Sequence, residues 1–186
     1  EVFNEYYHLR KVHPYTLSTL YATPDPVDKT DGAFVSQFGE HARRGSVGVL
    51  EEAGSGLEAL PGLSGRLANG TRYTWVYPGL TFAASRDAVW VLEAAPVTAS
   101  NTIVRLTLLF DKASMSAPDF QQILERYENR MAIGMDEDIV VLEAQQLGLH
   151  SRLARPGRIC PELEPSIHVF HRWYAGQLIG AGLAAG

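Results

Sequence analysis

The chain has 186 residues, 46% of them hydrophobic and 20% charged, which is typical of a folded domain with one buried core. Its formal net charge of −5 and the absence of any run of three basic residues argue against nucleic acid as a partner, and no apolar run reaches the roughly 20 residues that span a membrane. With a single cysteine, Cys160, the chain cannot form an internal disulfide or hold an iron–sulfur cluster, and a reducing cytoplasm is the expected compartment.

The N-terminal part of the chain is predicted to form a short helix followed by strands. A helix is expected over residues 1–12, because Pro14 disfavours helical backbone at the residue before it. A β-rich run follows at 15–22, and strand patterns occupy residues 33–41, 72–77, 80–85, 88–95 and 102–110. The last four strands have short connections, which imply antiparallel pairing because a parallel crossover needs about a dozen residues or more.

The C-terminal part is predicted to be helical. From Pro118 onwards, apolar residues recur at intervals of three and four, which predicts one long helix or a pair of helices over residues 118–151, with Gly134 as a candidate break. A last amphipathic helix is expected over residues 166–178. An antiparallel sheet with helices at both ends of the chain predicts a single α+β domain over residues 1–186.

His8 and His13 form the first candidate for chemistry. On an ideal helix they would lie about 140° apart around the axis, but Pro14 forces His13 into an extended conformation, so that the two rings can converge. Two neutral imidazoles are a good start for a transition-metal site, although such a pair alone is more typical of surface or capping histidines.

A carboxylate to complete the site is expected from the run MDED, residues 135–138. The helical pattern places Asp138 on the side that faces the core, whereas Asp136 and Glu137 are expected to be solvated residues of a helix start, stabilised by the helix dipole. A buried aspartate is costly unless a cation or hydrogen bonds stabilise it. Two histidines and one carboxylate form the facial ligand set that suits Fe(II).

Two motifs give the chain a family resemblance. The N-terminal motif E-x2-H-x4-H-P and the late motif E-D-I-x3-E-x2-Q-x-G-L-x-S resemble the C-terminal catalytic domain of Rieske non-heme iron oxygenase α-subunits. The middle of the chain, WVYPGLTFAASRDAVWVLEAAPV, and its closing helix, FHRWYAGQL, are also similar to that family. The resemblance implies a helix-grip fold, in which an antiparallel sheet curls around a long C-terminal helix.

The resemblance also implies the roles of four residues. His8, His13 and Asp138 would bind a mononuclear iron, and Glu5 would hydrogen-bond to a ligand histidine and thereby link it to the Rieske cluster of a neighbouring subunit. A homotrimer and a reductase or ferredoxin as electron donor are the implied partners. The chain departs from the family at Glu1, where an asparagine is usual, and it lacks the C-x-H and C-x2-H motif of a Rieske domain. We therefore expect the N-terminal Rieske domain, with its [2Fe–2S] cluster, to be absent from this chain.

The function implied is O2-dependent hydroxylation or oxidative demethylation of an aromatic or other small organic substrate, as in aromatic hydrocarbon catabolism. Three alternatives remain open from the sequence. The substrate could be a quaternary amine such as choline, carnitine or betaine. The chain could be a helix-grip module that binds a small ligand without a metal. It could also be a zinc hydrolase with the same three ligands, although it has no H-E-x-x-H motif.

Overall fold

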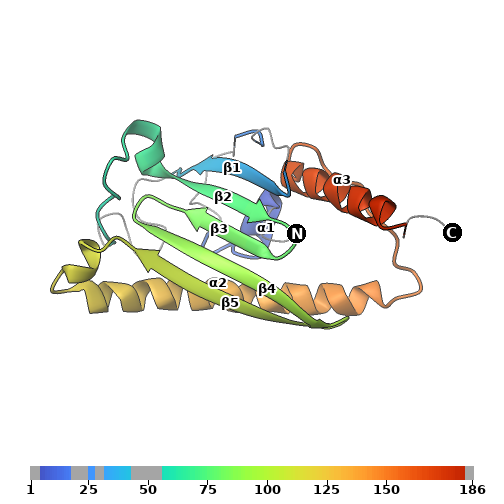
Figure 1. Cartoon of the computed structure of the whole chain (residues 1–186). Coiled ribbons are helices and arrows are strands. Elements are labelled where there is room, and N and C mark those ends of the chain that lie inside the picture. Colours follow the sequence, from blue (N-terminus) through green and yellow to red (C-terminus); the bar gives the residue numbers. More distant parts are fainter. Residues whose placement is uncertain (1–4, 18–24, 28–31, 43–55, 183–186) are drawn as a thin grey trace.

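The computed structural model describes residues 5–17, 25–27, 32–42 and 56–182. Within them, a sheet of five strands lies against one long helix, with a shorter helix at either end of the chain (Figure 1). The elements are α1 (Tyr6–Lys11), β1 (Phe34–Glu40), η2 (Gly65–Asn69), β2 (Gly70–Val76), β3 (Leu80–Ala84), β4 (Ala88–Thr98), β5 (Asn101–Phe110), η3 (Ser114–Ser116), α2 (Phe120–Leu149) and α3 (Pro165–Gly180).

The sheet is an antiparallel meander in which the strands lie in chain order, β1 to β5. The short connections of the sequence thus predicted the pairing correctly. Beyond Ala94, β4 pairs with β5 alone, which explains why the strand continues past Pro96, since proline is tolerated at a sheet edge. Gly79, in the turn between β2 and β3, lies so close to the carbonyl of Ala94 that a Cβ atom at this position would collide with it.

The long helix α2 is continuous over its 30 residues and does not break at Gly134. Its buried residues are Tyr127, Arg130, Gly134 and Asp138, which follow one another at helical spacing and therefore form a single stripe. Gly134 belongs to this stripe, where a Cβ atom would lie 3.2 Å from the Arg130 guanidinium. The glycine therefore makes room beside a buried side chain.

Two hydrophobic clusters hold the elements together. One joins the sheet to the first half of α2 through Leu57, Ala88 and Tyr127. The other joins β1 and β2 to α3, where the Phe170 ring lies 4.4 Å from that of Trp75 and Trp173 lies 4.9 Å from Tyr77, measured between ring centroids. The two clusters leave the space between them, under the middle of the sheet, to other side chains.

Several predicted boundaries differ from the structure. The first helix is shorter than predicted, because among the described residues it covers only Tyr6–Lys11. Residues 15–17, the described part of the predicted β-rich run, form a turn, and the rest of that run lies outside the described residues, as does Glu1. The last helix begins one residue before its predicted start, at Pro165, because proline is favoured in the first helical turn. None of the described helices combines the length and the hydropathy needed to cross a membrane.

Candidate metal centre

Two histidines from the N-terminal segment converge beneath the sheet. His8 lies in α1, and His13 follows the end of that helix, directly before Pro14. Their side chains are 7% and 1% exposed, and their ring centroids lie 5.2 Å apart at an interplanar angle of 73°. The bend expected at the proline thus brings the two imidazoles together.

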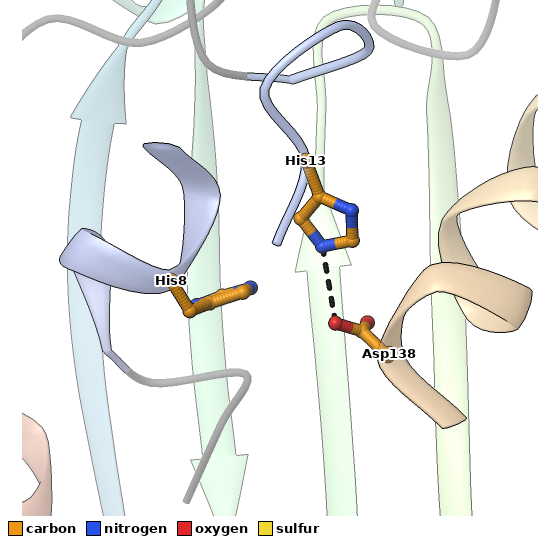
Figure 2. Close-up of side chains that lie close together, drawn as sticks. All are labelled: His8, His13 and Asp138. Atoms are coloured by element: carbon orange, nitrogen blue, oxygen red, sulfur yellow. Dashed lines mark ion pairs between the residues drawn. The ribbon is translucent and has the colours of Figure 1, made fainter. Parts of the chain in front are cut away.

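The third residue comes from the middle of α2. Asp138 is 3% exposed, and its Oδ1 atom lies 3.1 Å from Nε2 of His13. Figure 2 shows His8, His13 and Asp138 directed toward one another from three different parts of the chain fold. One ligand atom from each residue lies within 4.8 Å of the others. The structure therefore brings together the three residues that the resemblance implied as metal ligands.

The outer nitrogen of each ring is already engaged. Nδ1 of His8 contacts the main-chain carbonyl of Glu5, and Nδ1 of His13 lies 2.7 Å from Oε2 of Glu137. Both contacts are to acceptors, so each ring donates a hydrogen from Nδ1, and in the neutral form of the ring Nε2 then directs its lone pair toward the centre. This is the arrangement in which imidazoles bind metals.

The pKa values of the two histidines are shifted in opposite directions. Burial lowers the pKa of His8, although the contact with the Glu5 carbonyl opposes this effect. Burial acts in the same direction on His13, but its contacts with the carboxylates of Asp138 and Glu137 outweigh it, so that the pKa of His13 is raised. The centre thus favours a positive charge between His13 and the carboxylates.

The donor set fits a divalent cation. Among the described residues, Oδ1 of Asp138 has no hydrogen-bond partner, although Nε2 of His13 is only 3.1 Å away. A lone pair on nitrogen and one on a carboxylate oxygen repel each other unless a proton or a metal ion lies between them. Neighbouring ligand atoms around an ion with bonds of about 2.1 Å lie about 3 Å apart, so the His13–Asp138 pair already has suitable spacing.

Glu5, the fourth predicted site residue, lies beside the same centre and lines the pocket. Its contact with His8 comes from the main-chain carbonyl, whereas the resemblance implies a hydrogen bond from the side chain. Burial, together with hydrogen bonds to the carboxylates of Glu5 and Glu164, raises the pKa of the neighbouring Tyr7. The structure therefore places Glu5 next to the ligands and at the same time next to Tyr7, a half-exposed residue.

A pocket extends from the three ligands along the buried stripe of α2. Its apolar wall consists of Leu9, Leu17, Val35, Ala88, Leu92, Leu108, Met131 and Met135, and its aromatic side chains are Tyr73, Trp90 and Tyr127. At the end away from His8, the Tyr127 hydroxyl donates to Oδ2 of Asp87 at 2.5 Å and accepts from the main-chain N–H of Leu57 at 3.2 Å. The pocket is thus mainly apolar, with a polar group at each end.

Sequence reasoning missed three residues of this pocket and misplaced Glu137, which contacts His13 beside it. Tyr127, Arg130 and Asp87 were not singled out, although the spacing of Tyr127, Arg130 and Asp138 is that of one helical face. The prediction that Glu137 is a solvated residue of a helix start was wrong. The MDED run lies in the middle of α2, where no helix end is available to stabilise it, and Glu137 instead contacts His13. Asp136 is exposed, as predicted.

Comparison with known proteins agrees with this geometry. Residues 1–180 match the model of the ring hydroxylating alpha subunit (catalytic domain) family. The chain belongs to this family. The resemblance found in its sequence motifs is thereby confirmed.

Two solved structures show the same fold. One is a quaternary ammonium Rieske monooxygenase studied for carnitine oxidation by gut microbiota and for inter-subunit electron transfer; it is 22% identical, with a TM-score of 0.68 over 94% of this chain and 45% of that one. The other is the quaternary ammonium Rieske monooxygenase CntA in complex with an inhibitor, 20% identical, with a TM-score of 0.64 over 94% of this chain and 44% of that one. No curated protein matches the sequence. These matches confirm the predicted fold class, and the chain spans less than half the length of both structures.

Proposed function

We propose that this chain is the catalytic domain of a Rieske-type oxygenase, in which His8, His13 and Asp138 hold a mononuclear Fe(II). The observation that carries the proposal is the convergence of three buried ligand atoms at one end of an apolar pocket. When bound, the iron would supply the activation of O2 for hydroxylation or oxidative demethylation of a small organic substrate.

The chain's own residues have three tasks in this reaction. The Nε2 lone pairs of the histidines and the carboxylate of Asp138 would hold the ion. The apolar and aromatic wall excludes water and binds the substrate beside it. The main-chain carbonyl of Glu5 fixes the hydrogen of His8 on Nδ1, so that the ring keeps its orientation during turnover.

Electrons must come from outside these residues, because one cysteine cannot hold a Rieske cluster. We propose that the [2Fe–2S] cluster lies on a Rieske domain that is not part of the 186 residues and that a reductase or ferredoxin reduces it. We propose a homotrimer in which the cluster of one subunit faces Glu5 of the next; inter-subunit electron transfer in one structural relative supports transfer between subunits.

A quaternary amine is the second candidate substrate. Both structural relatives are quaternary ammonium monooxygenases. The rings of Tyr73 and Trp90, 5.9 Å apart on the pocket wall, offer the aromatic surface that binds such cations. Calorimetric titration of the iron-loaded chain with carnitine and with benzoate would separate an amine substrate from an aromatic acid.

The assignment of the iron site is tested by metal binding. We expect the chain to bind one Fe(II) under anaerobic conditions, measured by elemental analysis after removal of free metal, and we expect His8→Ala to lose it. His168→Ala is the matched control, because His168 is exposed on α3 and far from the centre in the sequence. Absence of bound iron in the wild type would favour the metal-free ligand-binding module, whereas hydrolysis with bound zinc and without O2 consumption would favour the hydrolase.

A further inference from the structure

One feature of the centre is not explained by ligand binding alone. Two consecutive residues of α2 contact the two nitrogens of one imidazole: Oδ1 of Asp138 lies 3.1 Å from Nε2 of His13, and Oε2 of Glu137 lies 2.7 Å from Nδ1. The His13 ring is thus held between two carboxylates that a single helix presents. Neighbouring helical residues point about 100° apart, which allows one side chain to reach each edge of the ring.

The Glu137 carboxylate has a second partner in the same segment. Oε2 accepts a hydrogen bond from the Thr16 hydroxyl at 2.9 Å, in addition to that from His13. Thr16 lies in the turn after His13, and the main-chain N–H groups of Thr16 and Leu17 both donate to the His13 carbonyl, at 3.3 and 3.1 Å. Glu137 therefore connects both the His13 ring and the turn that follows it to α2.

The burial of these groups separates this contact from an ordinary surface ion pair. The His13 side chain is 1% exposed and that of Glu137 is 26% exposed, so water competes little for the Nδ1 hydrogen. A carboxylate that accepts from Nδ1 keeps the hydrogen on that atom and leaves Nε2 free to bind a metal. It also makes Nε2 a better electron donor.

We propose that Glu137 is a positioning residue for the metal ligand His13, fixing its tautomer and ring orientation, and that Thr16 holds the Glu137 carboxylate in place. This inference rests on the proposed iron site. Glu137 is not one of the three candidate ligands and does not line the pocket, so its effect would reach the ion through the imidazole.

The test compares metal affinity in matched variants. Co(II) replaces Fe(II) as an air-stable probe, and its dissociation constant is measured by chelator competition at one fixed pH. We expect Glu137→Ala to weaken binding about 10- to 100-fold, as is typical for partners of ligand histidines. We expect a smaller loss in Glu137→Gln, since its amide oxygen can still accept from Nδ1, and a loss of a few-fold in Thr16→Val.

Asp136→Asn is the control, because Asp136 is exposed, lies one residue away and carries the same charge. Its affinity should equal that of the wild type. An equal loss in Asp136→Asn and Glu137→Gln would reduce the effect to net charge and overturn the proposal. Wild-type affinity in Glu137→Ala would also overturn it.

A second measurement reports on the hydrogen itself. In the Co(II) form, proton NMR should show one shifted, exchangeable ring N–H signal for each ligand histidine. We expect Glu137→Ala to lose the His13 signal through exchange with water, while the His8 signal persists. If the signal persists unchanged in this variant and in Glu137→Gln, the positioning role is wrong.

These outcomes are distinguishable from failure of the iron site. If the wild type binds no Co(II) or Fe(II), the proposed function fails. If the wild type binds and His8→Ala does not, but Glu137→Ala and Glu137→Gln both behave like the wild type, only the inference on Glu137 fails. Glu137→Gln is nearly isosteric, so the test holds even if the alanine variant does not fold.

Discussion

Two aspartates, Asp87 and Asp138, line the same pocket and are almost equally buried, with 1% and 3% exposure. Asp87 accepts a hydrogen bond from the Tyr127 hydroxyl at 2.5 Å, and a phenol is a neutral donor that keeps its proton. Asp138 faces a ring nitrogen whose partner nitrogen is already engaged by Glu137.

Burial alone therefore does not distinguish a structural carboxylate from a candidate metal ligand. At the Tyr127 end, the aromatic partner brings its own hydrogen, and the pair strengthens a packed cluster. At the His13 end, a neutral ring with its hydrogen on Nδ1 directs a lone pair toward the aspartate, so that a proton or a metal ion must lie between the two atoms. The role of each aspartate therefore depends on whether its partner, the Tyr127 hydroxyl or the His13 imidazole, directs a hydrogen toward it.

The largest expected effect is a difference in metal affinity between variants of the two aspartates. Asp138→Asn should weaken Fe(II) or Co(II) binding at least about 1,000-fold, or about 4 kcal/mol, because a charged ligand is lost. Asp87→Asn should leave the affinity within a few-fold of the wild type. Chelator competition measures both, and a comparable loss in the two variants would contradict the distinction drawn above.

An intermediate effect is expected at the other end of the pocket. Tyr127→Phe removes the donor to Asp87 and the acceptor for the Leu57 N–H, and it should lower the free energy of unfolding by about 1–3 kcal/mol. Urea denaturation measures the change. Metal affinity should be unchanged, and a loss of affinity larger than a few-fold would show that the two ends are coupled.

The smallest expected effect is a change in stability on removing a third buried polar group, the Tyr77 hydroxyl. Among the described residues, the Tyr77 hydroxyl has no hydrogen-bond partner, and burial raises its pKa to about 12. Tyr77→Phe should therefore change stability by less than about 1 kcal/mol at neutral pH. Because a raised pKa opposes ionisation in the folded state, the wild type should lose stability relative to the variant as pH rises from 10 toward 12. An equal pH dependence in denaturation curves of both proteins would refute this.

Local patterns in the sequence predicted the sheet and the burial of Asp138, whereas the family resemblance implied that His8, His13 and Asp138 form one site. Short connections specify antiparallel strands, Pro14 follows the end of α1 at Lys11, and helical spacing places Asp138 on a buried face. The role of Glu137 was not predictable in this way, since it depends on α2 continuing through Gly134 and on where the N-terminal segment docks.

The Tyr127 end of the pocket was missed for a similar reason. Tyr127 and Arg130 follow the helical period of α2, but Asp87 lies at the turn before β4, and only the folded sheet brings it to the Tyr127 hydroxyl. Contacts between distant segments need a docking geometry that no local pattern encodes.

The contact between His13 and Glu137 joins positions 124 residues apart in the chain. An ion held by His13 and Asp138 would therefore cross-link the N-terminal segment to α2, and the whole sheet lies between these two segments in the chain. We therefore expect the metal to bind late in folding. We also expect the metal affinity to fall in variants in which the sheet is incompletely folded.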